Sequence, residues 1–205
     1  MADLLRIGPL DHLGLAARTG WGGKAGLWLG ERRFPAMVNL RGDPVDAAFL
    51  SAAESALGAA LPVRANTRAS AGDVLVLWLG PDEWLVIGPA GSEAALEEKL
   101  SQAVAGAGGS VTAIGESRAT IVVSGPKARD VLAKGCPLDL HPLAFAGDAC
   151  AQSLIAGVNA TLYRADTGPA DPPRFELIVV RSFADFLWRF LEDAGQEYGV
   201  AVVEA

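Results

Sequence analysis

Short apolar runs alternate with stretches that repeat apolar residues at helical spacing. Residues 34–40 form the first apolar run, and Asp43-Pro44 follows it. An Asp N-cap followed by proline predicts that a helix begins there. Apolar residues then recur at spacings of three and four from Val45 to Leu57, and Gly58 is placed to end the helix. One face of this helix is therefore expected to pack on a sheet.

A hairpin and a second helix are predicted next. Residues 73–80 form a strand-like apolar run, and Pro81-Asp82 makes a turn into the strand 84–87. Ser92 is placed as the N-cap of a helix whose apolar stripe runs to Val104. A short strand at 111–114 completes the element order β-α-β-β-α-β in the first half of the chain.

The second half repeats this order. The expected elements are a strand at 119–123, a short helix opened by Gly125-Pro126 and closed by Gly135, a hairpin of 150–155 with 158–163, and strands at 175–180 and 200–203. Ser182 is the expected cap of a last helix, with Asp185 completing a capping box. Five residues of that helix are expected to face inward: Phe183, Phe186, Leu187, Phe190 and Leu191.

The pattern predicts an α+β fold of tandem duplicated ferredoxin-like units, with mostly antiparallel sheets and helices packed on them. The glycine-rich stretch 20–26 shows no periodicity, so residues 1–26 are interpreted as an extended N-terminal arm. Residues 27–115 and 116–205 are the two expected halves, together forming one compact domain.

Charge and cysteine content narrow the class of protein. The net charge of -7 argues against nucleic acid or an anionic membrane as a partner. Two cysteines are too few for a disulfide scaffold. The start Met1-Ala2-Asp3 is acidic where a signal peptide is basic, and no apolar run reaches signal length, which indicates the cytoplasm.

Candidate catalytic and ligand-binding residues are few. The histidines His12 and His141 and the cysteines Cys136 and Cys150 do not form a zinc-like pattern. A Cys136–His141 dyad would be within sequence reach, but the prolines around it favour a structural loop. Lys24 lies among glycines without the Ser or Thr of a phosphate loop, and no dinucleotide fingerprint is present. We therefore expect no catalytic, cofactor-binding or metal-binding residue in this chain.

An aromatic turn and an aromatic helix offer other candidates. Asp82-Glu83 beside Trp84 could act as an acid pair, but adjacent strand residues point to opposite faces, which favours a turn with Trp84 in the core or at an interface. Trp188 lies off the main apolar stripe of the last helix, and it is therefore interpreted as a partner contact.

Between Asn39 and Trp188 the chain resembles the gamma subunits of heterotetrameric sarcosine oxidase. The resemblance is carried by Asn39-Leu40-Arg41-Gly42, Leu61-Pro62, Asn66-Thr67, Leu77 through Leu85, Ser124-Gly125-Pro126, Gly135 through Leu140, Arg181-Ser182-Phe183-Ala184 and Leu187-Trp188. That family is similar in fold to the folate-binding domain of glycine-cleavage aminomethyltransferases, a domain built from tandem ferredoxin-like units.

The resemblance implies a non-catalytic subunit that supports assembly. The complex would oxidatively demethylate sarcosine to glycine with oxygen and tetrahydrofolate, giving hydrogen peroxide and methylenetetrahydrofolate. FAD, FMN, NAD and tetrahydrofolate would be held by partner subunits, with the alpha subunit as direct partner beside beta and delta subunits. The expected interface comprises Gly135, Cys136, Pro137, Leu138, Asp139, His141 and Trp188.

A stand-alone folate-binding or aminomethyltransferase-like protein is the alternative. It shares the fold, but 205 residues leave no room for the additional C-terminal barrel of the transferases.

Overall fold

The computed structural model describes residues 6–20, 24–165, 168 and 171–205. The chain divides into two compact units rather than the single compact domain expected from the sequence. Unit 1 combines the described residues up to Arg33 with 118–144 and 153–205, and unit 2 comprises 34–117 and 145–152. The units differ from the expected halves in residues 27–33, 116–117 and 145–152, each of which belongs to the other unit.

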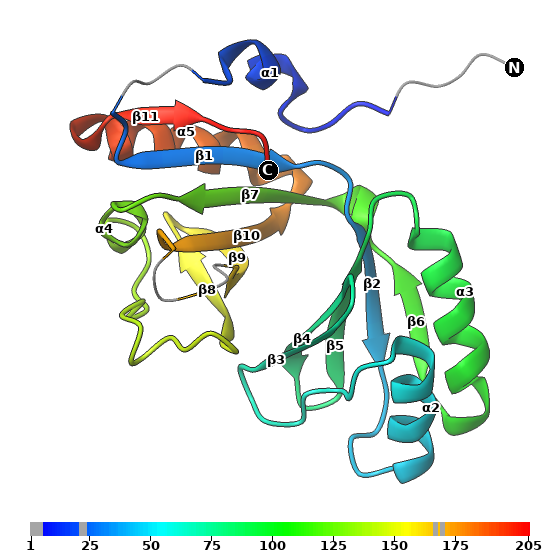
Figure 1. The fold of residues 1–205 in the computed structure, drawn as a ribbon. Helices are drawn as coiled ribbons and strands as arrows, with labels where there is room; N and C mark the ends of the chain where they lie inside the picture. The colour runs from blue at the N-terminus through cyan, green and yellow to red at the C-terminus, as the bar shows by residue number, and fades with distance from the viewer. Residues whose placement is uncertain (1–5, 21–23, 166–167, 169–170) are drawn as a thin grey trace, which may run out of the picture. The chain divides into compact units, whose positions relative to one another are not determined.

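Unit 2 is an antiparallel sheet with two helices that lie side by side along one face (Figure 1). Its strands run in the spatial order β3-β4-β5-β2-β6. The elements in chain order are β2 (Ala36–Arg41), α2 (Ala47–Leu57), β3 (Arg68–Ala71), β4 (Val74–Gly80), β5 (Glu83–Gly88), α3 (Glu93–Val104), the short 3-10 helix η2 (Ala105–Ala107), β6 (Ser110–Ala113) and the 3-10 helix η3 (Gly115–Ser117).

The core of unit 2 lies between the sheet and the helices. Trp84 on β5 is fully buried, its indole Nε1 donates to the Pro62 carbonyl at 2.8 Å, and its ring centroid lies 5.8 Å from that of Phe49 on α2. The placement of Trp84 in the core is thus confirmed. The Pro81-Asp82 turn is also confirmed, since β4 and β5 pair on either side of it.

The start of α2 differs from the prediction. Asp46 is the N-cap, with its side chain accepting from the Ala48 amide at 2.8 Å, whereas Asp43 accepts from the Val45 amide at 2.9 Å in the preceding turn. Val45 consequently lies outside the helix and is 86% exposed. At the other end, Gly58 adopts a φ of 73° and caps α2 as predicted.

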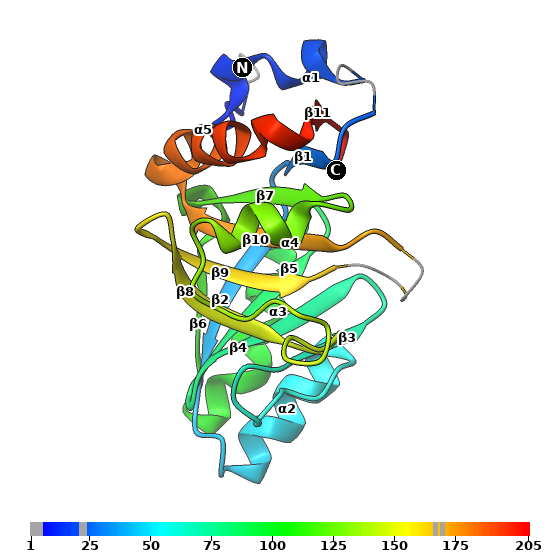
Figure 2. The same ribbon diagram turned by 90° about the vertical axis from the view of Figure 1, so that its left-hand side faces the viewer.

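Unit 1 contains a sheet in the order β11-β1-β7-β10-β9-β8. Its strands and longer helices are β1 (Leu27–Arg32), β7 (Arg118–Ser124), α4 (Ala128–Ala133), β8 (Cys150–Ile155), β9 (Val158–Arg164), β10 (Arg174–Val180), α5 (Ala184–Gly195) and β11 (Val200–Val202). The first residues of β8 belong to unit 2. The 3-10 helices η4 (Arg181–Phe183) and η5 (Gln196–Tyr198) flank α5. Figure 2 shows α5 running beside β7 and β11.

The two units share one topology, in which β3 of unit 2 is a strand that was not predicted, whereas the five strands predicted for the second half are all present as β7 to β11. Each follows the order β-α-β-β-β-α-β, from β2 to β6 in unit 2 and from β7 to β11 in unit 1. Unit 1 adds β1, which lies between β7 and β11 (Figure 1). It pairs antiparallel with β7 and parallel with β11, where Leu27 is opposite Val200. Leu27 and Leu29 are fully buried, which explains why this N-terminal strand is held in the sheet.

The N-terminal segment corrects the predicted extended arm. It forms the 3-10 helix η1 (Asp11–Leu13) and the one-turn helix α1 (Leu15–Arg18), and Leu10 is fully buried. The Gly20 amide donates to the Val202 carbonyl at 3.1 Å. Residues 21–23 of the glycine-rich stretch lie outside the described residues. Hereafter residues 6–20 are called the arm.

The face that α5 turns to the core was predicted only in part: Leu187 and Leu191 are buried as expected, but Phe183 and Phe186 are exposed. Leu187, Trp188 and Leu191 are fully buried, whereas Phe186 is 54% exposed. The buried positions follow each other at spacings of one and three residues and continue to Ala194, so they form the stripe that packs on the sheet. Within the described residues, no helix is long and apolar enough to cross a membrane.

Candidate subunit interface

The two cysteines are buried. Cys150 lies close to the Thr67 carbonyl, with its Sγ 3.2 Å from that oxygen, and burial raises the pKa of its thiol to about 11. Cys136 is 6% exposed. His141 Nδ1 accepts from the Leu143 amide at 3.2 Å, so the ring is engaged within its own loop. Among the described residues no group of His, Cys, Asp and Glu side chains is arranged to hold a metal ion.

A buried polar cluster lies on the unit 1 sheet, on the face opposite α4 and α5. The Glu176 carboxylate on β10, 5% exposed, accepts from Arg32 Nη1 at 3.1 Å and from the Tyr163 hydroxyl. Burial disfavours the charge of Arg32, but Glu176 and Tyr163 outweigh that effect and raise the pKa of its guanidinium. The negative charge of Glu176 is therefore balanced by the positive charge of Arg32. The contacts of Glu176 with Arg32 and Tyr163 link β1, β9 and β10.

The predicted interface segment begins at the tightly packed end of α4. The Gly135 carbonyl accepts from the Ala156 amide at 2.9 Å, and a Cβ at Gly135 would lie 2.6 Å from the Phe190 ring. Cys136 turns inward, and its amide donates to the Leu132 carbonyl at 2.8 Å. Gly135 and Cys136 thus anchor the segment, and their side-chain positions are part of the packing of unit 1.

Beyond this anchor the chain turns outward in a hydrogen-bonded loop. Asp139 Oδ1 accepts from the His141 amide at 2.9 Å, and His141 Nδ1 accepts from the Leu143 amide at 3.2 Å. Arg129 Nε on α4 donates to the Leu140 carbonyl at 2.9 Å and ties the middle of the loop to the unit. These bonds fix the backbone up to Leu143, whose side chain is 90% exposed.

The structure brings six of the seven predicted interface residues into one segment. Pro137, Asp139 and His141 are exposed and Leu138 is half-buried. Leu143, two residues past the predicted segment, is the most exposed large apolar side chain of the loop. Sequence reasoning missed it, because the nearby apolar residues Leu140 and Phe145 are both buried and nothing in the sequence distinguishes Leu143 from them.

The prediction for Trp188 is wrong. It was expected to contact a partner, but its side chain is fully buried in the helix–sheet core of unit 1. The physical reason is that α5 buries the stripe containing Leu187, Trp188 and Leu191, which leaves Phe183 and Phe186 outside. The exposed aromatic residues in this region are therefore Phe183, at the end of η4, and Phe186 on α5.

Comparisons with known proteins identify the family of this chain. The family model described as "Sarcosine oxidase, gamma subunit family" matches residues 41–197. The chain belongs to the sarcosine oxidase gamma subunit family. A gamma subunit of sarcosine oxidase from Corynebacterium sp. (strain P-1) is 35% identical over 196 residues, which cover 95% of this chain and 92% of that protein.

Solved structures give the same family and a wider fold relationship. The heterotetrameric sarcosine oxidase from Corynebacterium sp. U-96 has a chain that is 30% identical with a TM-score of 0.83, covering 95% of this chain and 97% of that one. The glycine cleavage system aminomethyltransferase T from Bartonella henselae matches with a TM-score of 0.67 at 20% identity, covering 98% of this chain and 60% of that one. This second likeness shows that this chain shares the fold of the matched 60% of that aminomethyltransferase.

Proposed function

We propose that this chain is a non-catalytic subunit of a heterotetrameric sarcosine oxidase and supports assembly of that complex by contacting its alpha subunit. The observation that carries the proposal is the match to one chain of a solved heterotetrameric sarcosine oxidase over almost the whole of both chains, together with membership of the gamma subunit family. The alpha, beta and delta subunits complete the complex, and the cytoplasm is its proposed compartment.

The proposed complex converts sarcosine, oxygen and tetrahydrofolate to glycine, hydrogen peroxide and methylenetetrahydrofolate. FAD, FMN, NAD and tetrahydrofolate are assigned to the partner subunits. This assignment is supported by membership of the gamma subunit family.

The contact with the alpha subunit is assigned to the loop 137–144 of unit 1. Its backbone is fixed by the Asp139 and His141 side chains, so little ordering entropy is lost when a partner covers it. Leu143 at 90% exposure is the side chain that a partner's apolar pocket would bury. A leucine moved from water into such a pocket contributes roughly 1.5–3 kcal/mol.

Co-expression with the alpha, beta and delta subunits tests the proposal. We expect the four chains to purify together, with sarcosine-dependent peroxide formation, and the isolated chain to show no flavin absorption. Leu143→Asp should reduce recovery of this chain in the complex by about ten-fold or more, because a charge would enter an apolar pocket. Val45→Asp, at an 86% exposed position of unit 2, is the matched control.

Two results would contradict the proposal. The assembly role is wrong if the unmodified chain never joins the complex, and the loop assignment is wrong if Leu143→Asp joins it as well as the control does. Calorimetric titration of the isolated chain with tetrahydrofolate distinguishes the alternative, because clear binding would favour a stand-alone folate-binding protein.

A further inference from the structure

The strand orders of the two sheets coincide except for β1. In unit 2 the first strand, β2, pairs directly with the last strand, β6, and this pair is antiparallel. In unit 1 the corresponding strands are β7 and β11, and β1 lies between them. Because β1 is antiparallel to β7 and parallel to β11, β11 runs antiparallel to β7. The strand direction that a direct β7–β11 pair would need is therefore already present.

The register across β1 also matches a direct pair. In unit 2, Arg41 at the end of β2 is opposite Ser110 at the start of β6. In unit 1, Ser124 at the end of β7 is opposite Trp28, which is in turn opposite Ala201 in β11. The end of the first strand is thus level with the last strand in both units. A sideways shift of β11 by one strand spacing, about 4.8 Å, would complete the pairing seen in unit 2.

The side chains of β11 face the same way as those of β1. Leu27 is opposite Val200 and Leu29 is opposite Val202, and opposite residues of neighbouring strands point to the same face of a sheet. A Cβ at Gly195, the last residue of α5, would lie 2.4 Å from Leu27 Cδ2 and 2.9 Å from Val200 Cγ2, which places both side chains against α5. After the shift, the two valines would take the places of the two buried leucines.

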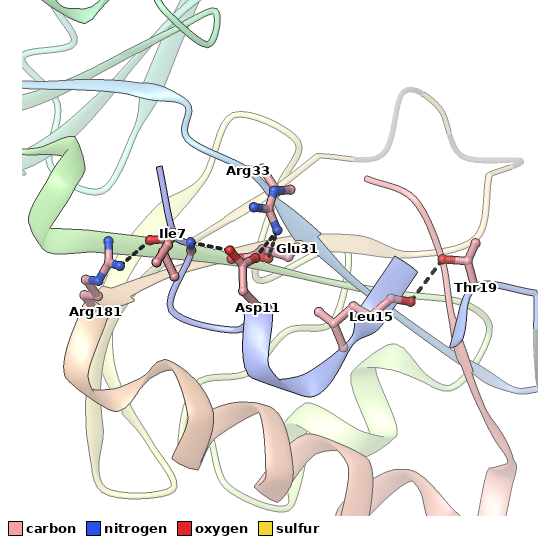
Figure 3. Close-up of polar contacts among 8 residues, drawn as sticks. Ile7, Asp11, Leu15, Thr19, Glu31, Arg33 and Arg181 are labelled. Carbon is pink, nitrogen blue, oxygen red and sulfur yellow. Dashed lines mark hydrogen bonds and ion pairs between the residues drawn. The ribbon is translucent and has the colours of Figure 1, made fainter. Parts of the chain in front are cut away.

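Polar contacts at the end of β1 hold this strand in the sheet. Arg32 Nη1 donates at 3.1 Å to Glu176 on β10, two strands away. Asp11 of the arm accepts from Arg33, directly after β1 (Figure 3). If β1 left the sheet, Glu176 would keep a cation beside it, because Arg174 Nη2 lies 3.6 Å from Glu176 Oε1. The contacts of β1 with Glu176 and the arm are therefore side-chain contacts at one end of the strand.

We propose that β1 is an exchangeable strand. It fills a strand-binding slot between β7 and β11, and unit 1 closes to the five-stranded order of unit 2, by direct β7–β11 pairing, when β1 is withdrawn. The slot binds an extended segment with alternate apolar residues, which β1 supplies as Leu27 and Leu29. Main-chain hydrogen bonds and alternate side chains are the contacts of strand addition. This exchange is a property of unit 1 and does not depend on the proposed function.

Disulfide cross-linking in the full chain distinguishes the two arrangements. Ser124→Cys/Ala201→Cys places thiols on strands that β1 separates, so their Cα atoms lie about 10 Å apart, too far for a disulfide. Leu27→Asp/Leu29→Asp puts two charges at buried positions and should expel β1. With these aspartates present, the cross-linked fraction should rise by about ten-fold or more, because the two cysteines become direct neighbours.

Two controls accompany this comparison. Ser124→Cys/Arg174→Cys joins opposite positions of β7 and β10, and it should cross-link with or without the aspartates. Val45→Asp/Val63→Asp adds the same charge at positions of unit 2 that are 86% and 61% exposed, and it should leave the cysteines at positions 124 and 201 reduced. Peptide mass spectrometry identifies the bonded cysteines and separates them from the two native thiols.

A synthetic peptide of residues 24–33 tests the slot directly. The peptide should bind the full chain that carries Leu27→Asp/Leu29→Asp, and it should lower the cross-linking between β7 and β11 because it occupies the space between them. The unmodified chain should bind the peptide at least about ten-fold more weakly, since its slot is filled by β1. Fluorescence anisotropy of the labelled peptide measures binding, and the same peptide with both leucines replaced by aspartate is the control.

Circular dichroism decides whether unit 1 stays folded without β1. A retained spectrum together with the new cross-link would support the exchange. Loss of structure in Leu27→Asp/Leu29→Asp would overturn it, because unit 1 would then be unable to close without β1. A folded variant that neither cross-links nor binds the peptide would overturn it as well.

Hydrogen–deuterium exchange of the unmodified chain gives a test without substitutions. Amides of β1 should exchange about ten-fold or more faster than those that join β7 to β10, because β1 leaves the sheet while the rest stays folded. Equal protection of these two sets of amides would show that β1 is released only by global unfolding, which would overturn the proposal.

Discussion

At the scale of single residues, glycines mark the places where backbone and side chains come closest. Gly42 follows β2 in unit 2, and a Cβ there would lie 2.2 Å from the ring of Phe49. That ring is fully buried and packs beside Trp84, so it has no open space into which it can move. Glycine is required at this position by the close approach of the backbone to the core.

Gly42→Ala is expected to destabilise unit 2 by about 1–3 kcal/mol, because the added methyl group overpacks the Phe49 site. Urea unfolding followed by tryptophan fluorescence measures the change. Gly106→Ala is the control, since a Cβ at Gly106 meets no atom within 4 Å. Equal effects of the two substitutions would show that the space beside Phe49 is not limiting.

Cys150 is expected to make the folded protein less stable as pH rises through the alkaline range. Burial raises its pKa from 9.0 to about 11. Between these values the unfolded chain releases the thiol proton and the folded chain keeps it, so the free energy of unfolding falls as pH rises. The contribution of the protonated Cys150 thiol to the free energy of unfolding is fully present below pH 9 and is lost as pH rises through 11.

Cys150→Ala should therefore flatten this part of the stability profile. Chemical unfolding of both proteins at intervals from pH 8 to 11 gives the comparison, and the difference between the two curves isolates the thiol from other titrating groups. Parallel curves over the whole range would mean that the thiol titrates normally in the folded protein.

At the scale of elements, the arm is fastened to unit 1 by one buried side chain and several polar contacts. Leu10 is fully buried, Arg18 pairs with Glu192 on α5, and Thr19 forms an isolated bridge with Val202 beside β11. Apolar burial at one end and backbone pairing at the other hold the arm at two separate points. The ion pairs between them are partly exposed and contribute little by comparison.

Leu10→Ala is expected to cost about 2–4 kcal/mol and to loosen the arm, because it empties a buried apolar site. Hydrogen–deuterium exchange of residues 6–20 should accelerate, together with that of β11. Ile7→Ala, at a 66% exposed position, should leave both the exchange and the stability near their original values. Unchanged exchange in Leu10→Ala would show that the polar contacts suffice to dock the arm.

Features that depend on neighbouring residues, such as turns and helix caps, were predicted well. Packing against residues far away in the sequence was predicted poorly. The Pro81-Asp82 turn and the Gly58 cap each depend on nearby residues, and both lie where predicted. Strand β3 reads Arg-Ala-Ser-Ala and has no apolar alternation, so the sequence did not reveal it. Trp188 was misplaced because the face of an aromatic-rich helix is chosen by the sheet it packs on, which periodicity alone does not identify.

At the scale of the whole molecule, the two units share a topology but have different proposed roles. The proposed contact surface, the loop 137–144, belongs to unit 1. Unit 1 is also the unit that gained β1 and the arm. The two units together match part of an aminomethyltransferase structure, while the residues proposed to take part in assembly belong to unit 1.

The position of β1 between β7 and β11 has a consequence for synthesis on the ribosome. Strand β1 is made early, but its partner Val200 is translated 173 residues after Leu27 (200 minus 27). Unit 2 receives most of its strands in the interval, and its core elements from β2 to β6 come from one continuous stretch of chain. Strand β1 therefore remains unpaired while the strands of unit 2 are synthesised. During that time Leu27 and Leu29, which are buried in the folded protein, are the apolar residues of β1 that a chaperone would bind.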